Sequence, residues 1–247
     1  MFSEGNVLLV SYTAREKASK GAYDTTDAET AKAEGIFNPE RQYRPLPVII
    51  GKGHVFERLE NELREMKAGE TRKIELAPKD AFGERNQELI RIIALKSFHD
   101  KKINPFPGLI VEVDGMHGKI QSVSGGRVKV DFNHELAGKE LEYEIKVERR
   151  IESEKEIAET LAEKYFSFLP KEQLKVEESG SEKITVKMPK ALVEAKEFKA
   201  IGEEFREMIA GSVKAKIGFE GFEEKKGAEK EGEEKSTESE AEREKVG

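Results

Sequence analysis

The chain has 247 residues, of which 36% are hydrophobic and 38% charged, a length that suits one large domain or two to three small ones. Its formal net charge of −7 argues against a nucleic-acid-binding protein, because neutralising phosphates needs a basic face. No cysteine is present, which excludes disulfides, thiolate nucleophiles and cysteine-ligated zinc. Glu and Lys dominate the charged residues, a balance typical of thermophilic proteins.

The sequence gives no sign of membrane insertion or secretion. The longest apolar runs, at 7–10 and 47–50, are far shorter than the ~20 residues that a spanning helix needs. An acidic residue precedes the first apolar run, and no small-residue cleavage pattern follows it, which is not typical of a secretory signal. A cytoplasmic protein without membrane contact is therefore expected.

The first elements predict an antiparallel sheet covered by one helix. Apolar and polar residues alternate at 72–78 and 139–152, and an apolar run marks a first strand at 7–12. A helix over 54–66 is predicted because apolar residues recur there at helical spacing. These residues are Val55, Leu59, Leu63 and Met66. One short helix on such a sheet belongs to the α+β class.

A glycine turn, Gly51-Lys52-Gly53, joins the apolar run at 47–50 to this helix. Helix N-termini can bind phosphate through free N–H groups. However, a phosphate-binding loop continues with Lys-Ser or Lys-Thr after its last glycine, and His54 follows here. A dinucleotide fingerprint needs glycine at its sixth position, which is Phe56. The pattern therefore favours a bend over a phosphate site.

Short strands and tight turns from 86 to 132 predict a small β-rich unit. Asp114-Gly115 and Gly125-Gly126 lie between alternating runs and are hairpin signals, because glycine supplies the positive φ that tight turns need. A long strand follows this unit, so we expect it to be inserted into the first domain. The predicted boundaries are 86–132 for the insert, and 1–85 plus 133–151 for the domain that carries it.

A third unit is predicted over 152–222. It begins with a helix whose Ser153 and Glu156 form a capping-box pattern, and a second helical stripe runs from Leu192 to Met208. With three short strands between and after these helices, this unit is a small α+β domain. Its size is at the lower end for independent stability, so a homodimer through this domain is expected. The tail at 223–247 has no aromatic residue and predicts disorder.

Few residues offer covalent or acid–base chemistry. The four histidines form no helical His-x-x-x-His pair, and no serine stands in a G-x-S-x-G elbow. The carboxylates lie in solvated charge runs, so no acid–base pair can be named. Neither a metal nor a cofactor is expected. What remains is an apolar concavity where strand, helix and loops meet, with the alternative that its residues are only core.

Several segments, taken in order, resemble the FKBP family of peptidyl-prolyl isomerases, and within it the SlyD-like archaeal branch with an insert-in-flap domain. They cover about residues 5–150. The most specific are "VIIGKG" before the helix, "DAFGE", and "FNHELAGK" returning from the insert. The resemblance implies an FKBP-like antiparallel sheet on a short helix, with an inserted flap domain. By placement and length, the C-terminal unit is similar to the extra domain of long archaeal members.

The resemblance also implies a set of site residues. Those matching catalytic positions are Tyr12, Asp24, Phe56 (through its backbone N–H), Phe82 and Tyr143. Those matching the substrate-binding wall are Tyr23, Leu46, Val55 and Leu59. Two positions depart from the family pattern, since Leu59 falls where many relatives have tryptophan and Phe82 where they have tyrosine. Macrolide binding is thereby put in doubt.

The function implied by the resemblance is peptidyl-prolyl isomerisation with chaperone activity on unfolded or proline-containing polypeptides. The insert holds more apolar residues than a small unit readily buries, so part of them is expected to form a chaperone surface. The residues chosen for it are Ile92, Phe98, Phe106 and Leu109. A tight mini-core with nothing exposed is the alternative for the insert. For the whole chain, the alternatives are a non-catalytic holdase and a dimeric scaffold.

Overall fold

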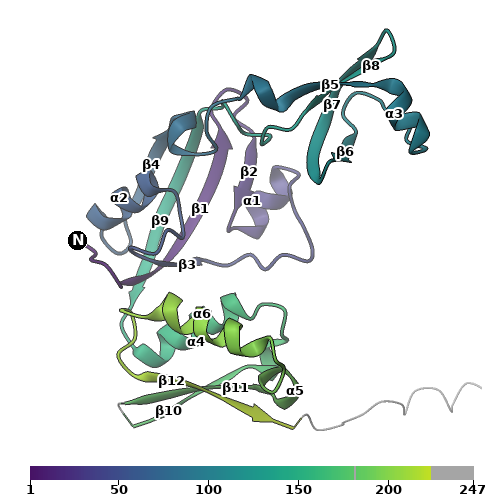
Figure 1. The fold of residues 1–247 in the computed structure, drawn as a ribbon. Coiled ribbons are helices and arrows are strands. Elements are labelled where there is room, and N and C mark those ends of the chain that lie inside the picture. The colour runs from purple at the N-terminus through teal and green to yellow at the C-terminus, as the bar shows by residue number, and fades with distance from the viewer. Residues whose placement is uncertain (181, 224–247) are drawn as a thin grey trace, which may run out of the picture. The chain divides into compact units, whose positions relative to one another are not determined.

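The computed structural model describes residues 1–180 and 182–223, so the tail predicted to be disordered lies, beyond Glu223, outside the described residues. The chain divides into two compact units (Figure 1). The first comprises Met1–Ile157 with Ile209–Ser212, and the second comprises Ala158–Met208 and the chain from Val213 onward. Among the described residues, no helix is both long enough and apolar enough to cross a membrane.

The main sheet of the first unit is built around two long antiparallel strands, β1 (Val7–Glu16) and β9 (Leu141–Ile151). The first half of β1 also pairs with β3 (Leu46–Ile49), and its second half with β2 (Ala22–Thr25). On the other side of β9 lies β4 (Thr71–Leu76). Every pairing is antiparallel, which confirms the predicted kind of sheet.

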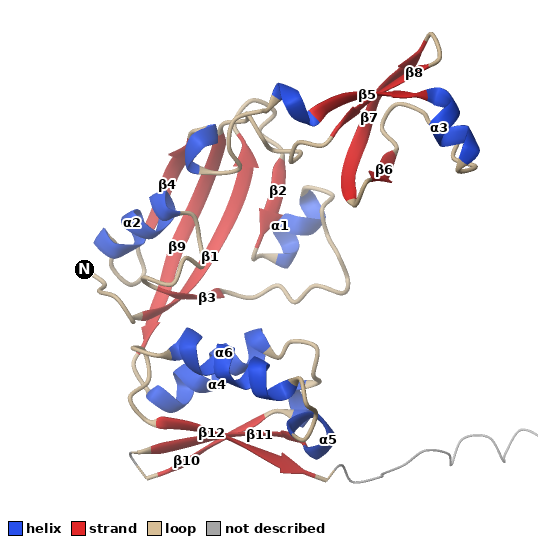
Figure 2. Cartoon of the chain, in the orientation of Figure 1, coloured by secondary structure: helices blue, strands red, loops and turns tan. Residues whose placement is uncertain are grey.

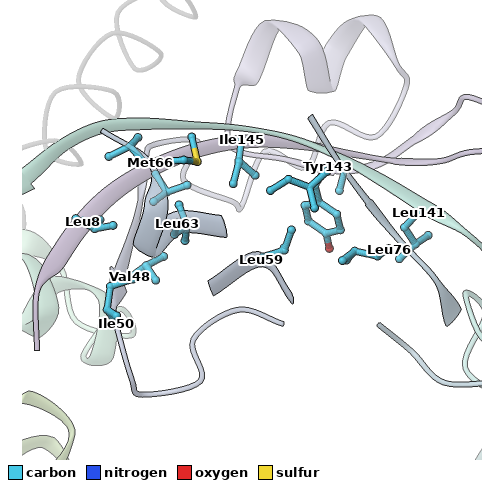
Figure 3. Close-up of a cluster of buried hydrophobic side chains, with 14 residues drawn as sticks. Leu8, Val48, Ile50, Leu59, Leu63, Met66, Leu76, Leu141, Tyr143 and Ile145 are labelled. Carbon is cyan, nitrogen blue, oxygen red and sulfur yellow. The ribbon is translucent and has the colours of Figure 1, made fainter. Parts of the chain in front are cut away.

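Helix α2 (Glu57–Glu65) packs its apolar stripe against this sheet. Leu59 and Leu63 are buried, as is Met66 just after the helix, and they join strand residues in one core. Figure 3 shows this core, with Leu59 beside the ring of Tyr143. The helix begins three residues later than predicted, because the glycine turn and a bend occupy 51–55.

A second helix of this part, α1 (Ala28–Ala33), was not predicted. It has six residues and one buried side chain, Ala31, so it has no amphipathic repeat to detect. Asp27 caps it, because its side chain accepts a 2.7 Å hydrogen bond from the Thr30 amide.

The insert forms its own four-stranded sheet in the order β5-β8-β7-β6 (Figure 2). The strands are β5 (Ile90–Ala94), β6 (Ile110–Val113), β7 (Met116–Ser124) and β8 (Arg127–Asp131). Both predicted hairpin turns are present, and all four of their residues have positive φ, at 53° and 76° for Asp114-Gly115 and 55° and 72° for Gly125-Gly126. The β-rich character of the insert is therefore confirmed.

The insert also contains a helix, α3 (Leu95–Asp100), that the sequence analysis missed. It carries Phe98 into a mini-core with Val111, Ile120, Val128 and Val130. Phe98 is 3% exposed, so its assignment to a chaperone surface is wrong. The physical reason is that Phe98, the largest apolar side chain of α3, packs on the apolar side chains of the insert's strands and is covered by them.

Two crossing segments tie the insert to the main sheet. The backbone N–H of Asn86 donates to the side-chain Oδ1 of Asn133 at 2.8 Å. The side-chain Nδ2 of Asn133 donates back to the backbone carbonyl of Asn86 at 2.9 Å. Buried Asp131 accepts hydrogen bonds from Arg85, from Gln121 at 2.9 Å and from Asn133. The domain boundaries at 85/86 and 132/133 stay a prediction. A short 3-10 turn, η1 (Pro78–Asp80), precedes the predicted insert, and a second, η2 (Gln87–Leu89), lies at its start.

The C-terminal part is α+β. Its sheet has β11 (Lys183–Pro189) between antiparallel β10 (Lys175–Ser179) and parallel β12 (Lys216–Phe222). The helices are α4 (Glu154–Tyr165), α5 (Lys190–Val193) and α6 (Phe198–Ile209), with a 3-10 turn η3 (Lys171–Gln173). Phe166 and Phe205 are fully buried and contact Phe198 and Phe219, so this small unit has an aromatic core of its own.

Two sequence features of this part can be compared with the structure. The Ser153 hydroxyl accepts a 3.4 Å hydrogen bond from the Glu156 amide, which confirms the cap at the start of α4. The stripe from Leu192 to Met208, in contrast, is split between α5 and α6. A turn closed by the bond from the Phe198 amide to the Ala195 carbonyl redirects the chain, and Phe198 then packs at 5% exposure in the aromatic core.

Candidate active site

A cavity of about 320 Å³ opens where the start of α2 meets the main sheet. Its wall is largely apolar, and it is lined by side chains from β1, β3, α2 and β9 together with the glycine turn. The lining residues are Val10, Tyr12, Leu46, Gly53, His54, Val55, Phe56, Leu59, Leu63, Tyr143 and Ile145. A site of this kind suits an apolar group that carries a few polar atoms.

The glycine turn is held by protein groups. Gly51 and Gly53 have φ of 91° and 65°, a conformation that side chains disfavour. The Gly51 amide donates to the buried carboxylate of Glu60 at 3.0 Å, and Arg64 donates to the same oxygen at 2.8 Å. The Nδ1 atom of His54 accepts the Ile49 amide at 3.2 Å. A carboxylate occupying the turn disfavours a bound phosphate, as the sequence pattern indicated.

Phe56 immediately precedes α2, with φ of −54° and ψ of 142°. At such a position the backbone N–H has no partner inside the helix. No side chain caps this helix end. The Phe56 ring also meets the Phe82 ring edge-on at 5.2 Å and the Tyr143 ring at 6.3 Å.

One side of the cavity is fixed by a chain of polar contacts. The Tyr12 hydroxyl donates to one oxygen of Asp24 at 2.6 Å, and Arg41 donates to the other. Burial, together with the bond to Asp24, raises the pKa of Tyr12 well above its usual value, so this phenol stays protonated. Asp24 therefore accepts from both neighbours and orients Tyr12 at the cavity wall.

Tyrosine and phenylalanine rings form the other side. The Tyr23 hydroxyl donates to the Tyr143 hydroxyl at 2.7 Å, and their rings meet edge-on at 6.2 Å. Tyr23 also meets Phe82 edge-on at 6.4 Å. Burial is the main cause that raises the pKa of both tyrosines. These edge-on contacts, each worth ~1 kcal/mol, hold a rigid aromatic wall.

The structure brings all nine predicted site residues to one region. Those that line the cavity are Tyr12, Leu46, Val55, Phe56, Leu59 and Tyr143. The remaining three lie behind this lining. Asp24 contacts Tyr12, Tyr23 contacts Tyr143, and Phe82 contacts Phe56. Their catalytic and binding roles stay predictions.

Sequence reasoning missed several participants. Arg41 lies in an irregular loop, and only its charge could have suggested a link to Asp24. His54 was named only as the residue that follows the glycine turn, although it also lines the cavity. Among residues 1–180 and 182–223, no group of three or more His, Asp or Glu residues is placed to hold a metal ion.

Comparison with known proteins agrees with this geometry. The model of the FKBP-type peptidyl-prolyl cis-trans isomerase family matches residues 4–99, and that of the FKBP26 IF domain matches residues 91–136. The short-type peptidyl-prolyl cis-trans isomerase of Methanocaldococcus jannaschii is 39% identical over 124 residues, covering 50% of this chain and 79% of that protein. The chain belongs to the FKBP-type peptidyl-prolyl cis-trans isomerases.

Two further relatives place this FKBP-type isomerase in its family. The FKBP-type 16 kDa peptidyl-prolyl cis-trans isomerase of Escherichia coli is 32% identical over 129 residues, covering 50% of this chain and 80% of that protein. SlyD of Vibrio cholerae is 32% identical over 128 residues, covering 46% of this chain and 59% of that protein. The predicted resemblance to FKBP-type enzymes with an insert-in-flap domain is thus confirmed.

The buried tyrosines predict how the stability of this isomerase depends on pH. Tyr23 and Tyr143 have raised pKa values in the folded chain, whereas unfolded tyrosines ionise near pH ~10. Above that pH the unfolded state releases protons that the folded state keeps, so the free energy of unfolding falls. Urea unfolding between pH 9 and 11 measures this fall. Tyr23→Phe is expected to make it shallower, and an unchanged slope would contradict the prediction.

Proposed function

We propose that this FKBP-type isomerase binds the proline ring of a polypeptide in the 320 Å³ cavity and the adjoining carbonyl at the Phe56 N–H. The observation that carries the proposal is this amide at the start of α2, beside an apolar wall of Leu46, Leu59 and Tyr143. A main-chain N–H is a fixed donor, and a carbonyl entering the cavity needs one because it leaves water behind.

Catalysis by such a site needs no proton transfer. Rotation about an X-Pro bond faces a barrier of about 18–20 kcal/mol because amide resonance resists twisting. Resonance separates charge, so an apolar surrounding weakens the planar ground state relative to the less dipolar twisted state. Each ~1.4 kcal/mol removed from the barrier raises the rate about tenfold. In this proposal the Tyr12–Asp24–Arg41 chain keeps the wall rigid.

We include chaperone activity in the proposal, with the insert as the surface for unfolded chains. Ile92, Phe106 and Ile110 are 66%, 56% and 68% exposed, whereas Leu109 is half-buried. The exposed surface therefore differs from the predicted set, because Phe98 belongs to the core and Ile110 joins the exposed group. A client held there would have a raised effective concentration at the neighbouring cavity.

The role of the Phe56 amide can be isolated with two substitutions. Phe56→Ala and Phe56→Pro both remove the ring, but only proline removes the N–H, and the φ of −54° suits proline. We expect kcat/KM on a Leu-Pro or Phe-Pro peptide to be about fivefold lower for Phe56→Pro than for Phe56→Ala, the worth of one hydrogen bond. The measurement is a protease-coupled or NMR isomerisation assay.

The controls for that assay separate folding from function. Thermal unfolding of both variants has to show the same folded fraction at the assay temperature. Equal kcat/KM for the two variants would remove the Phe56 amide from the proposal. No acceleration by the unmodified chain would favour the alternative of a holdase that binds without turnover.

Two further expectations stay predictions. A homodimer through the C-terminal unit is checked by light scattering on the full chain. A monomer mass would contradict both the homodimer prediction and the alternative of a dimeric scaffold. The expected cytoplasmic location is checked by fractionation of the source cells.

A further inference from the structure

The loop between α1 and β3, residues 34–45, contains no helix or strand, yet one side chain closes it on itself. The Tyr43 hydroxyl accepts a 2.9 Å hydrogen bond from the backbone N–H of Asn38 and donates to the backbone carbonyl of Ile36 at 3.5 Å. The backbone N–H of Arg41 donates to the Asn38 carbonyl at 3.1 Å. The shape of the loop therefore depends on the Tyr43 side chain.

The Tyr43 ring contacts a second ring and a guanidinium. It stacks on Phe37, with 5.3 Å between centroids and 13° between planes. The Arg41 guanidinium lies over the Tyr43 ring, 5.4 Å from its centroid, where the negative face of the ring attracts a cation. The same stack has a second cation, because the Lys32 ammonium lies 5.4 Å from the Phe37 centroid. Lys32 pairs with Glu29 at 2.8 Å, and Arg41 pairs with a residue of the proposed active site.

That active-site residue is Asp24. Arg41 donates to one of its oxygens, and the other accepts the hydroxyl of the cavity-lining Tyr12. The Arg41 side chain is 41% exposed, and an ion pair in such a position fixes a long side chain only weakly. A second contact lowers the number of rotamers that the side chain can adopt. The Tyr43 ring supplies this contact to Arg41.

The position of Tyr43 favours this role over a role in the core or in the cavity. The side chain is half-buried and does not belong to the apolar core of the main sheet. It does not line the cavity beside α2 either. What links it to the proposed active site is the guanidinium of Arg41.

We propose that Tyr43 is a positioning residue, whose ring holds the Arg41 guanidinium on Asp24. Asp24, held in this way, keeps the Tyr12 hydroxyl at the cavity wall. This inference rests on the proposed function, because it assumes that the cavity lined by Tyr12 binds proline. It extends the machinery of isomerisation to a loop residue that does not itself touch the substrate.

The first test compares two substitutions of Tyr43 in the full chain. Tyr43→Leu removes the ring, whereas Tyr43→Phe keeps the ring and removes only the hydroxyl. The measurement is kcat/KM on a Leu-Pro peptide in a protease-coupled or NMR assay. We expect Tyr43→Leu to lower kcat/KM about two- to fivefold, the worth of an exposed cation–π contact, and Tyr43→Phe to retain most of the activity.

A double-mutant cycle with Arg41→Met separates positioning from a general effect on stability. Methionine keeps a long side chain but has no charge to lie over the ring. If the ring acts through the guanidinium, Tyr43→Leu lowers kcat/KM in the unmodified chain and has no further effect in the Arg41→Met chain. The NMR signal of the Arg41 Nε–H, identified by its absence in Arg41→Met, is a second measurement. We expect Tyr43→Leu to shift this signal, because it removes the neighbouring ring.

Lys32→Met is the matched control. It removes the other cation of the same stack, which lies at the same 5.4 Å distance from a ring but pairs with Glu29 instead of Asp24. We expect both kcat/KM and the Arg41 signal to stay as they are in the unmodified chain. Thermal unfolding of every variant sets an assay temperature at which all of them are folded.

The outcomes distinguish this inference from the proposal on which it rests. Equal losses from Tyr43→Leu with and without Arg41→Met would overturn it, since the ring would then act independently of the guanidinium. It would also be wrong if Tyr43→Leu left kcat/KM or the Arg41 signal unchanged, or if Lys32→Met lowered kcat/KM as much as Tyr43→Leu. In each of these cases the unmodified chain still accelerates isomerisation, whereas absence of that acceleration is the failure of the proposed function.

Discussion

Deletion of residues 87–131 is expected to lower the catalysed refolding of a proline-limited unfolded protein by about a hundredfold, because tethering a client beside the cavity raises its effective concentration by about 10² or more. The loss on a short proline peptide should be far smaller, since that peptide gains little from the tether. Hydrogen bonds of 2.8 and 2.9 Å between Asn86 and Asn133 already bring the cut ends together. Refolding kinetics and peptide kcat/KM are the two measurements.

Two substitutions within the insert act as controls for that deletion. Phe106→Ser removes an exposed apolar side chain and is expected to weaken client binding with little loss of stability. Phe98→Ala empties a buried position and is expected to cost the insert about 3–5 kcal/mol. If Phe106→Ser and the deletion both left refolding as fast as the full chain does, the tethering role of the insert would be wrong.

The second large effect is expected for Asp24→Ala, which should lower peptide kcat/KM by about tenfold or more. The substitution removes the acceptor of the Tyr12 hydroxyl and the partner of Arg41, and each partly buried group left unpaired costs ~1–3 kcal/mol. Part of that cost falls on stability and part on the geometry of the cavity wall. The peptide assay measures the activity, and urea unfolding measures the stability.

Glu34→Ala is the matched control for Asp24→Ala. Glu34 pairs with Arg15 at 2.5 Å, and its side chain is about as exposed as that of Asp24. Asp24 contacts the cavity-lining Tyr12, whereas the partners of Glu34, Arg15 and Ala22, do not line the cavity. A surface pair of this kind contributes ~0–1 kcal/mol, so we expect kcat/KM to stay within about twofold. Equal losses in the two variants would mean that Asp24 acts only through general stability.

The main elements were predictable because their signals are local. Alternation of side chains predicted β4 and β9, and the stripe of Leu59 and Leu63 predicted α2. Paired glycines and Asp114-Gly115 predicted the insert's hairpins, since positive φ is a property of a few residues. The short helices α1 and α3 were not found, because six residues do not give a helical repeat.

The active-site region was predictable only in part. The resemblance supplied Tyr12, Asp24 and Phe56, whereas Arg41 belongs to a loop without periodicity and was missed. Similarly, nothing near His134 in the sequence indicates that it is stacked on Phe82, 52 positions earlier. Contacts of this kind depend on where separate loops meet.

The sequence by itself determined the long strands, helix α2, the tight turns of the insert and the family pattern that they follow, because these depend on neighbouring residues. Only the tertiary structure decided which apolar side chains are covered. Phe98 is buried and Ile110 is 68% exposed, although both are apolar residues of the same small insert. Burial depends on which face of a sheet a helix covers, and that is fixed by packing between distant segments.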